Sequence, residues 1–139
     1  MKKALLIVNP ASGGEKAKEY ETKMHHKLAQ YFDNVIIRHT KESGDAKVFA
    51  HEASEQHYHS VFVMGGDGTV NEAINGISGH AERPYFGFLP LGTVNDLARA
   101  LDIPLDPEEA IDSLDLDNPR ALDVGQVNDC LLYTSPSPR

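Results

Sequence analysis

A glycine-rich turn at residues 65–68, Gly-Gly-Asp-Gly, separates two apolar segments that have different periodicities. Residues 60–64 before the turn form a short run of β-branched and aromatic residues, which predicts a buried strand. Residues 70–77 after the turn carry apolar side chains at helical spacing, so we expect a helix that begins near Thr69. A strand, a tight turn and a helix in this order bring backbone N–H groups and a positive helix end to one place, where a phosphate can bind.

The order of residues in the turn disfavours two common nucleotide-binding motifs. A Rossmann fingerprint needs a third glycine where this chain has Asn71, and the Gly-Lys-Ser/Thr ending of a Walker A loop does not occur. Asp67 would repel a phosphate unless a cation bridged the two groups, so the turn predicts a site for a metal–nucleotide complex. The structural alternative is a tight turn that needs glycine only for positive φ.

The length and net charge of the chain limit the classes of function that it can have. The chain has 139 residues, of which 40% are hydrophobic and 24% charged, as expected for one globular domain. A net charge of −8 argues against nucleic-acid binding and against attraction of the whole surface to an anionic membrane. The apolar run at residues 4–8 is too short for a signal peptide, no run reaches transmembrane length, and the single cysteine fits a reducing compartment. We therefore expect a cytoplasmic protein.

Strand and helix patterns alternate along the chain. Strands are expected at residues 4–8, 34–40, 60–64 and 85–89, with a short extended segment at 122–125; helices are expected at 15–31 and from about residues 46, 69, 97 and 106. Four βα units in succession predict a doubly wound α/β fold with a mainly parallel sheet. Ligands bind beyond the carboxyl ends of the strands in such folds. The loops at residues 9–14, 65–69 and 90–96 are expected there, with Thr40 at a fourth strand end.

The end of the chain differs in character from the rest. Residues 134–139 read Thr-Ser-Pro-Ser-Pro-Arg, a composition typical of an unstructured tail. The segment also resembles translated adapter sequence. We therefore expect a native domain at residues 1–129 and a disordered or non-native tail at residues 130–139.

Three motifs together resemble a known family. Asn-Pro-Ala-Ser-Gly at residues 9–13, Gly-Gly-Asp-Gly-Thr-Val-Asn-Glu at 65–72 and Pro-Leu-Gly-Thr-Val-Asn-Asp-Leu-Ala-Arg at 90–99 are similar in order and spacing to the catalytic domain of bacterial diacylglycerol kinases and related lipid kinases. The second motif is shared with NAD kinases and phosphofructokinases, whereas the first and third favour the lipid-kinase branch. The resemblance covers about residues 2–129, and it implies ATP-dependent, Mg²⁺-requiring phosphorylation of a lipid hydroxyl.

The resemblance also implies the residues of the site. The implied ATP contacts are Asn9, Ser12, Gly13, Thr40, Gly65, Gly66, Asp67, Gly68, Thr69, Asn71, Glu72, Gly92 and Thr93. Asp67, Asp96 and Asp123 match acidic positions associated in the family with Mg²⁺, held directly or through water, and Asp67 is the candidate catalytic residue. Glycine N–H groups, threonine hydroxyls and carboxylates suit this chemistry, because phosphoryl transfer depends mostly on positioning and charge neutralisation.

Family members continue into a second, β-rich domain that supplies the general base, further metal ligands and much of the lipid site. This sequence stops where that domain would begin, so no general base is assigned, and we expect the chain alone to bind nucleotide without phosphorylating lipid. Membrane contact at the inner face would run through that domain, and the lipid acceptor and a homodimer are left open. Two alternatives remain: a soluble nucleotide kinase resembling NAD kinase, and a non-catalytic nucleotide-binding module.

Overall fold

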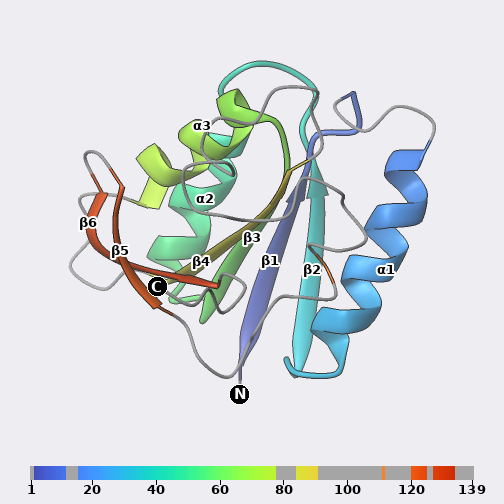
Figure 1. Ribbon diagram of the computed structural model, residues 1–139, viewed down its shortest axis with the longest axis horizontal. Coiled ribbons are helices and arrows are strands. Elements are labelled where there is room, and N and C mark those ends of the chain that lie inside the picture. Colours follow the sequence, from blue (N-terminus) through green and yellow to red (C-terminus); the bar gives the residue numbers. More distant parts are fainter. Residues whose placement is uncertain are drawn as a thin grey trace, which may run out of the picture.

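The computed structural model describes residues 2–11, 16–77, 84–90, 111, 120–124 and 127–133 (Figure 1). Strands and helices alternate from β1 to β4, as the sequence pattern predicts. In chain order they are β1 (Lys3–Val8), α1 (Ala17–Ala29), β2 (Asn34–His39), α2 (Asp45–Glu55), β3 (Ser60–Gly65), α3 (Asp67–Ile77), β4 (Tyr85–Pro90), β5 (Arg120–Val124) and β6 (Val127–Tyr133).

The strands form one sheet in the order β2-β1-β3-β4-β6-β5. All neighbouring pairs from β2 to β6 are parallel, and only the terminal pair β5–β6 is antiparallel. The central strands β1 and β3 are buried almost from end to end, which explains why their sequences are continuously apolar. The predicted α/β fold with a mainly parallel sheet is confirmed.

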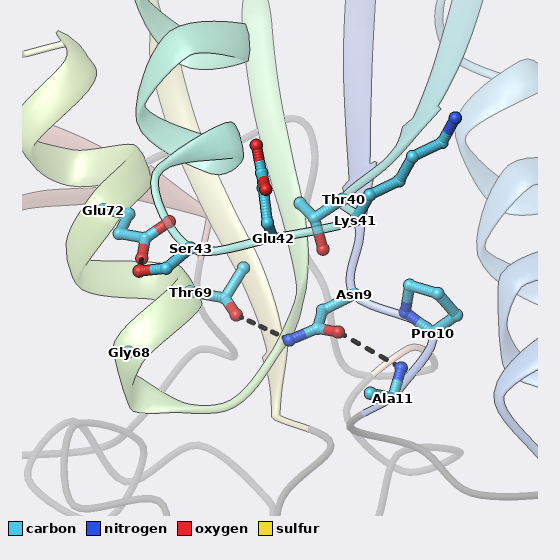
Figure 2. Close-up of a pocket in the computed structure, with 10 residues that line it drawn as sticks. All are labelled: Asn9, Pro10, Ala11, Thr40, Lys41, Glu42, Ser43, Gly68, Thr69 and Glu72. Atoms are coloured by element: carbon cyan, nitrogen blue, oxygen red, sulfur yellow. Dashed lines mark hydrogen bonds between the residues drawn. The ribbon is translucent and has the colours of Figure 1, made fainter.

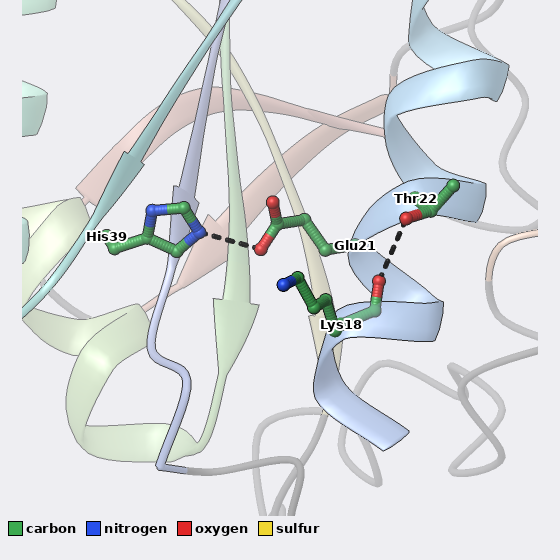
Figure 3. A network of polar contacts seen from close by, with 4 residues as sticks. All are labelled: Lys18, Glu21, Thr22 and His39. Atoms are coloured by element: carbon green, nitrogen blue, oxygen red, sulfur yellow. Dashed lines mark hydrogen bonds and ion pairs between the residues drawn. The ribbon is translucent and has the colours of Figure 1, made fainter. Parts of the chain in front are cut away.

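Helices cover both faces of the sheet (Figure 1). Successive side chains of a strand point to opposite faces, and two neighbours in β2 show where the helices lie. Arg38 Nη1 bonds Glu52 Oε1 of α2 at 2.7 Å, whereas His39 Nε2 bonds Glu21 Oε1 of α1 at 2.7 Å (Figure 3). Helix α1 therefore lies on one face and α2 on the other, where α2 also packs against α3.

The helices expected at residues 15–31 and from about residues 46 and 69 are present, and their ends differ by a few residues. Helix α1 buries Ala17, Met24 and Leu28, which recur at helical spacing, and it spans Ala17–Ala29 and not 15–31. Helix α3 begins at Asp67, two residues before the expected Thr69. The reason is that the Val70 N–H already bonds the Gly66 carbonyl at 3.1 Å, so the glycine turn is also the first turn of the helix.

The expected extended segment near residue 122 corresponds to β5. Strand β6 continues through Cys130 to Tyr133, so regular structure extends four residues past the point where the tail was expected to begin. These four residues, Cys-Leu-Leu-Tyr, are apolar and suited to a strand. Their origin stays a prediction, and residues 134–139 lie outside the described part of the chain.

The helices expected from residues 97 and 106 also lie outside the described residues, except for Ile111, which is helical and buried. Across the portion that the structure describes, no helix has the length and apolar character needed to cross a bilayer.

Candidate functional site

The carboxyl ends of β1, β2 and β3 meet at one edge of the sheet. Backbone hydrogen bonds hold the segments that follow them together: Asn9 N–H donates to the Met64 carbonyl at 2.9 Å, and Thr40 N–H donates to the Val8 carbonyl at 2.8 Å. Parallel strands necessarily end at the same edge, so residues far apart in sequence become neighbours here.

A pocket of about 470 Å³ opens at this edge (Figure 2). Its walls come from the segment after β1, the segment after β2 and the first two turns of α3. The lining residues are Asn9, Pro10, Ala11, Thr40, Lys41, Glu42, Ser43, Gly68, Thr69 and Glu72.

The half-buried Asn9 side chain joins two of these walls. Its Nδ2 donates to Thr69 Oγ1 at 3.1 Å, and its Oδ1 accepts from Ala11 N–H at 3.1 Å (Figure 2). The second bond closes an Asx turn that directs the chain away from β1. The amide thus fixes both the Thr69 hydroxyl and the start of the first loop.

The wall formed by residues 40–44 is held by two carboxylates. Asp45 Oδ2 accepts from Lys41 N–H at 2.8 Å and from Glu42 N–H at 3.1 Å, and these bonds hold the pKa of Asp45 below its ordinary value of 3.8. Glu72 of α3 accepts from Gly44 N–H at 3.0 Å and from Ser43 Oγ at 3.3 Å. The segment therefore has its own internal turn and a tie to α3.

The amino end of α3 faces the pocket with backbone donors. Val70 is the first residue whose N–H bonds a carbonyl of the same helix, so the N–H groups of Asp67, Gly68 and Thr69 have no acceptor within α3. These groups carry the positive end of the helix dipole. The arrangement suits an anion such as a phosphate.

The glycines of the turn have different reasons to be glycine. None of Gly65, Gly66 and Gly68 has a positive φ, so the structural alternative of a turn that needs glycine for its backbone conformation is wrong. A Cβ on Gly65 would lie 3.0 Å from Thr69 Cβ, which is a packing reason. Within the described residues, a Cβ on Gly66 or Gly68 would meet no atom within 4 Å. Neither the backbone nor the packing of this part of the chain requires glycine at these two positions, and the space beside them suits a ligand.

Five of the residues that the sequence predicted line the pocket together: Asn9, Thr40, Gly68, Thr69 and Glu72. Gly65 is the last residue of β3, Gly66 links β3 to α3, and Asn71 is exposed on α3 without lining the pocket. Asp67 begins α3 and Asp123 lies in β5, but their side chains are outside the described part of the structure. Also outside it are Ser12, Gly13, Gly92, Thr93 and Asp96.

Sequence reasoning did not assign five lining residues, namely Pro10, Ala11, Lys41, Glu42 and Ser43. Their signal is position alone, because each follows a strand end that already carried a predicted residue. Figure 2 shows the Lys41 side chain extending away from Asn9 and Thr69. Among the described residues, no three His, Cys, Asp or Glu side chains gather as a metal site.

Comparison with known proteins identifies the family. Residues 3–127, most of the chain, match the diacylglycerol kinase catalytic domain family. The chain belongs to this family.

Two relatives and a solved structure show how much of a family member's length this chain covers. The diacylglycerol kinase of Bacillus subtilis is 40% identical over 129 residues, which is 92% of this chain and 43% of the relative. That of Staphylococcus carnosus is 37% identical over 127 residues, 91% of this chain and 42% of the relative. A crystal structure of a diacylglycerol kinase from Bacillus anthracis superposes with a TM-score of 0.72 at 40% identity, covering 79% of this chain and 40% of that one. The chain thus spans about two fifths of the length of the proteins it matches.

Proposed function

We propose that this chain is the ATP-binding part of a lipid kinase that transfers the γ-phosphoryl group of ATP to a lipid hydroxyl. The observation that carries the proposal is the open space at Gly66 and Gly68, within the described residues, beside the first N–H groups of α3, which have no acceptor inside the helix. A ligand that needs close approach to backbone donors explains glycine at positions where the folded chain itself does not require it.

The residues of the pocket have separate tasks in this proposal. The first N–H groups of α3 bind phosphate oxygens, and the Thr69 hydroxyl, oriented by Asn9, adds a short hydrogen bond. Thr40 offers a second hydroxyl on the opposite wall. Bound Mg²⁺ would neutralise phosphate charge, and Asp67, Asp96 and Asp123 are the proposed ligands, directly or through water.

The acceptor class comes from the family alone. Relatives named diacylglycerol kinase are more than twice as long as this chain, which leaves room beyond the matched residues for a region that would bind lipid and supply a general base. We accordingly assign the lipid site and the base to that region. The 139-residue chain alone is proposed to bind Mg·ATP and to transfer no phosphate.

A hybrid enzyme tests the proposal. Residues 3–127 of this chain replace the matching residues of the Bacillus subtilis relative, and the hybrid is incubated with Mg²⁺, γ-labelled ATP and a mixed lipid extract. We expect label in the lipid phase, and we expect Asp67→Ala in the hybrid to abolish it. The unmodified relative serves as the positive control for the assay.

Other outcomes favour the alternatives. Label that appears only in a water-soluble product such as NADP would make the site that of a soluble nucleotide kinase. ATP binding without transfer to any acceptor, while the unmodified relative labels lipid, would support the non-catalytic module.

A further inference from the structure

We propose that Glu72 is a positioning residue: it ties α3 to the start of α2 and so holds residues 40–44 as one wall of the pocket, without itself contacting ATP or metal. This inference rests on the proposed function, and it assigns Glu72 a different role from the direct ATP contact that the family resemblance implies.

Both carboxylate oxygens of Glu72 have partners in the loop that precedes α2. Oε1 accepts from the Gly44 N–H at 3.0 Å, and Oε2 accepts from Ser43 Oγ at 3.3 Å. Figure 2 shows the carboxylate turned toward Ser43, whereas the Asn9–Thr69 hydrogen bond lies nearer the start of α3. The two contacts join residues 28 and 29 positions apart in the chain.

Helix α2 needs this carboxylate because it has no cap of its own. Its N-cap residue is Gly44, which has φ 96° and no side chain that could accept a hydrogen bond. A left-handed φ favours glycine here, so a serine or aspartate cap at this position would be strained. Glu72 instead brings an acceptor and a negative charge from α3 to the positive end of α2.

The close packing of α2 on α3 fixes where the carboxylate sits. A Cβ on Gly76 would lie 2.4 Å from the Lys47 carbonyl oxygen, so the two helix backbones approach closely at that point. Glu72 is one turn before Gly76 on the same face of α3, which directs its side chain along α2 toward Gly44.

The segment that Glu72 holds behaves as a unit. Asp45 ties Lys41 and Glu42 to the first turn of α2, and Thr40 is bonded to β1 through the Val8 carbonyl. Releasing Gly44 and Ser43 would free the α2 end of this wall while the β1 end stays attached. Ligand affinity falls when only a fraction of the molecules has the wall in place.

Two substitutions separate positioning from direct contact. Glu72→Gln keeps an oxygen acceptor for Gly44 N–H and an amide that can donate to Ser43 Oγ, but it removes the charge. Glu72→Ala removes both contacts. Isothermal titration of the 139-residue chain with Mg·ATP gives the Kd, amide hydrogen exchange gives the protection of Gly44, and Glu19→Ala, an exposed change on α1, is the matched control.

We expect Glu72→Ala to raise the Kd on the order of tenfold, because a charge-assisted hydrogen bond that favours the bound arrangement is lost. Exchange at Gly44 should accelerate in the same variant. Glu72→Gln should keep the Kd within about threefold of the unmodified chain, the scale of a weakened single hydrogen bond, and should keep Gly44 protected.

The proposal would be overturned if Glu72→Gln raised the Kd as much as Glu72→Ala while Gly44 stayed protected. That result would mean that the negative charge of Glu72 contacts the ligand or its metal. An unmodified chain that binds no Mg·ATP would refute the proposed function instead. In that case Gly44 exchange still reports the tie: equal protection in the Ala variant and the unmodified chain would show that Glu72 holds nothing.

Discussion

Replacement of Gly68 by alanine should raise the stability of the chain and weaken its binding of Mg·ATP. It lies in the first turn of α3 with a φ that any residue adopts, and a Cβ there would meet no atom of the described residues within 4 Å. Gly68→Ala should therefore raise the free energy of unfolding by about 0.5–1 kcal/mol, because alanine loses less backbone entropy in a helix. The added methyl group would occupy the space beside the N–H groups that are proposed to bind phosphate, so the Kd for Mg·ATP should rise.

Thermal unfolding and titration with Mg·ATP on the same preparations measure both effects. The melting temperature should increase by about 2–6 °C, the shift expected for such a gain in a domain of this size. Gly66→Ala is the companion variant, since its Cβ would also meet no atom. If Gly68→Ala stabilises the chain and leaves the Kd for Mg·ATP unchanged, the phosphates do not bind beside Gly68.

His59 should make stability depend on pH. It contacts the rings of Phe32 and Tyr85, with centroid distances of 5.6 and 5.0 Å, and burial, followed by the charge of Lys2, lowers its pKa from the ordinary 6.5. A lowered pKa means that the unfolded chain binds the proton more readily. The stabilising effect is complete above pH 6.5 and should be lost as the pH falls through the pKa of the folded protein.

Urea unfolding between pH 5 and pH 8 tests this dependence. The chain has seven histidines, so the informative quantity is the difference in the free energy of unfolding between the unmodified chain and His59→Gln, whose glutamine cannot be charged. As the pH falls, the variant should become more stable relative to the unmodified chain. A difference that does not change with pH would show that His59 titrates normally.

At the scale of elements, the contact between α2 and α3 depends on Gly76. Alanine at a helix interior is intrinsically better than glycine by about 1 kcal/mol. At Gly76, however, the new Cβ would lie 2.4 Å from the Lys47 carbonyl and 3.0 Å from Ala50 Cβ, so the helices must separate. We expect Gly76→Ala to lower the free energy of unfolding by about 1–3 kcal/mol, the usual cost of overpacking.

Chemical denaturation measures this change, and Gly68→Ala on the same helix is its control. Opposite signs for the two variants would separate steric crowding from helix propensity. A stabilised Gly76→Ala chain would mean that α2 and α3 are not in backbone contact.

The elements also show what the sequence could and could not predict. Helix α1 and the strands β1 and β3 followed from the local sequence, because α1 has apolar residues at helical spacing and the two buried strands are continuously apolar. The start of α3 was misplaced because its glycines resemble a loop. The wall at Lys41, Glu42 and Ser43 was not assigned, since it depends on Glu72, whose contact with Gly44 spans 28 residues of sequence and leaves no local periodicity.

At the scale of the whole molecule, the sheet continues beyond the residues that match the family. The family match ends at residue 127, yet β6 runs from Val127 to Tyr133 and pairs with β4 through Leu132 and Tyr133. These two residues are the registered partners of Phe86 and Gly87, so they cover the edge of β4. The segment expected to be a tail therefore protects a strand that would otherwise present unpaired backbone groups.

Two shortened chains distinguish a structural role of this segment from an incidental one. A chain of residues 1–133 keeps the β4–β6 pairing, whereas a chain of residues 1–129 loses it. We expect the shorter chain to be less stable by roughly 1–2 kcal/mol, the size of a typical destabilising change, and to associate more readily through the uncovered edge of β4. Thermal unfolding and light scattering measure these effects. Equal stability and equal dispersity would show that residues 130–133 add nothing to the fold, as expected if they are foreign to the native protein.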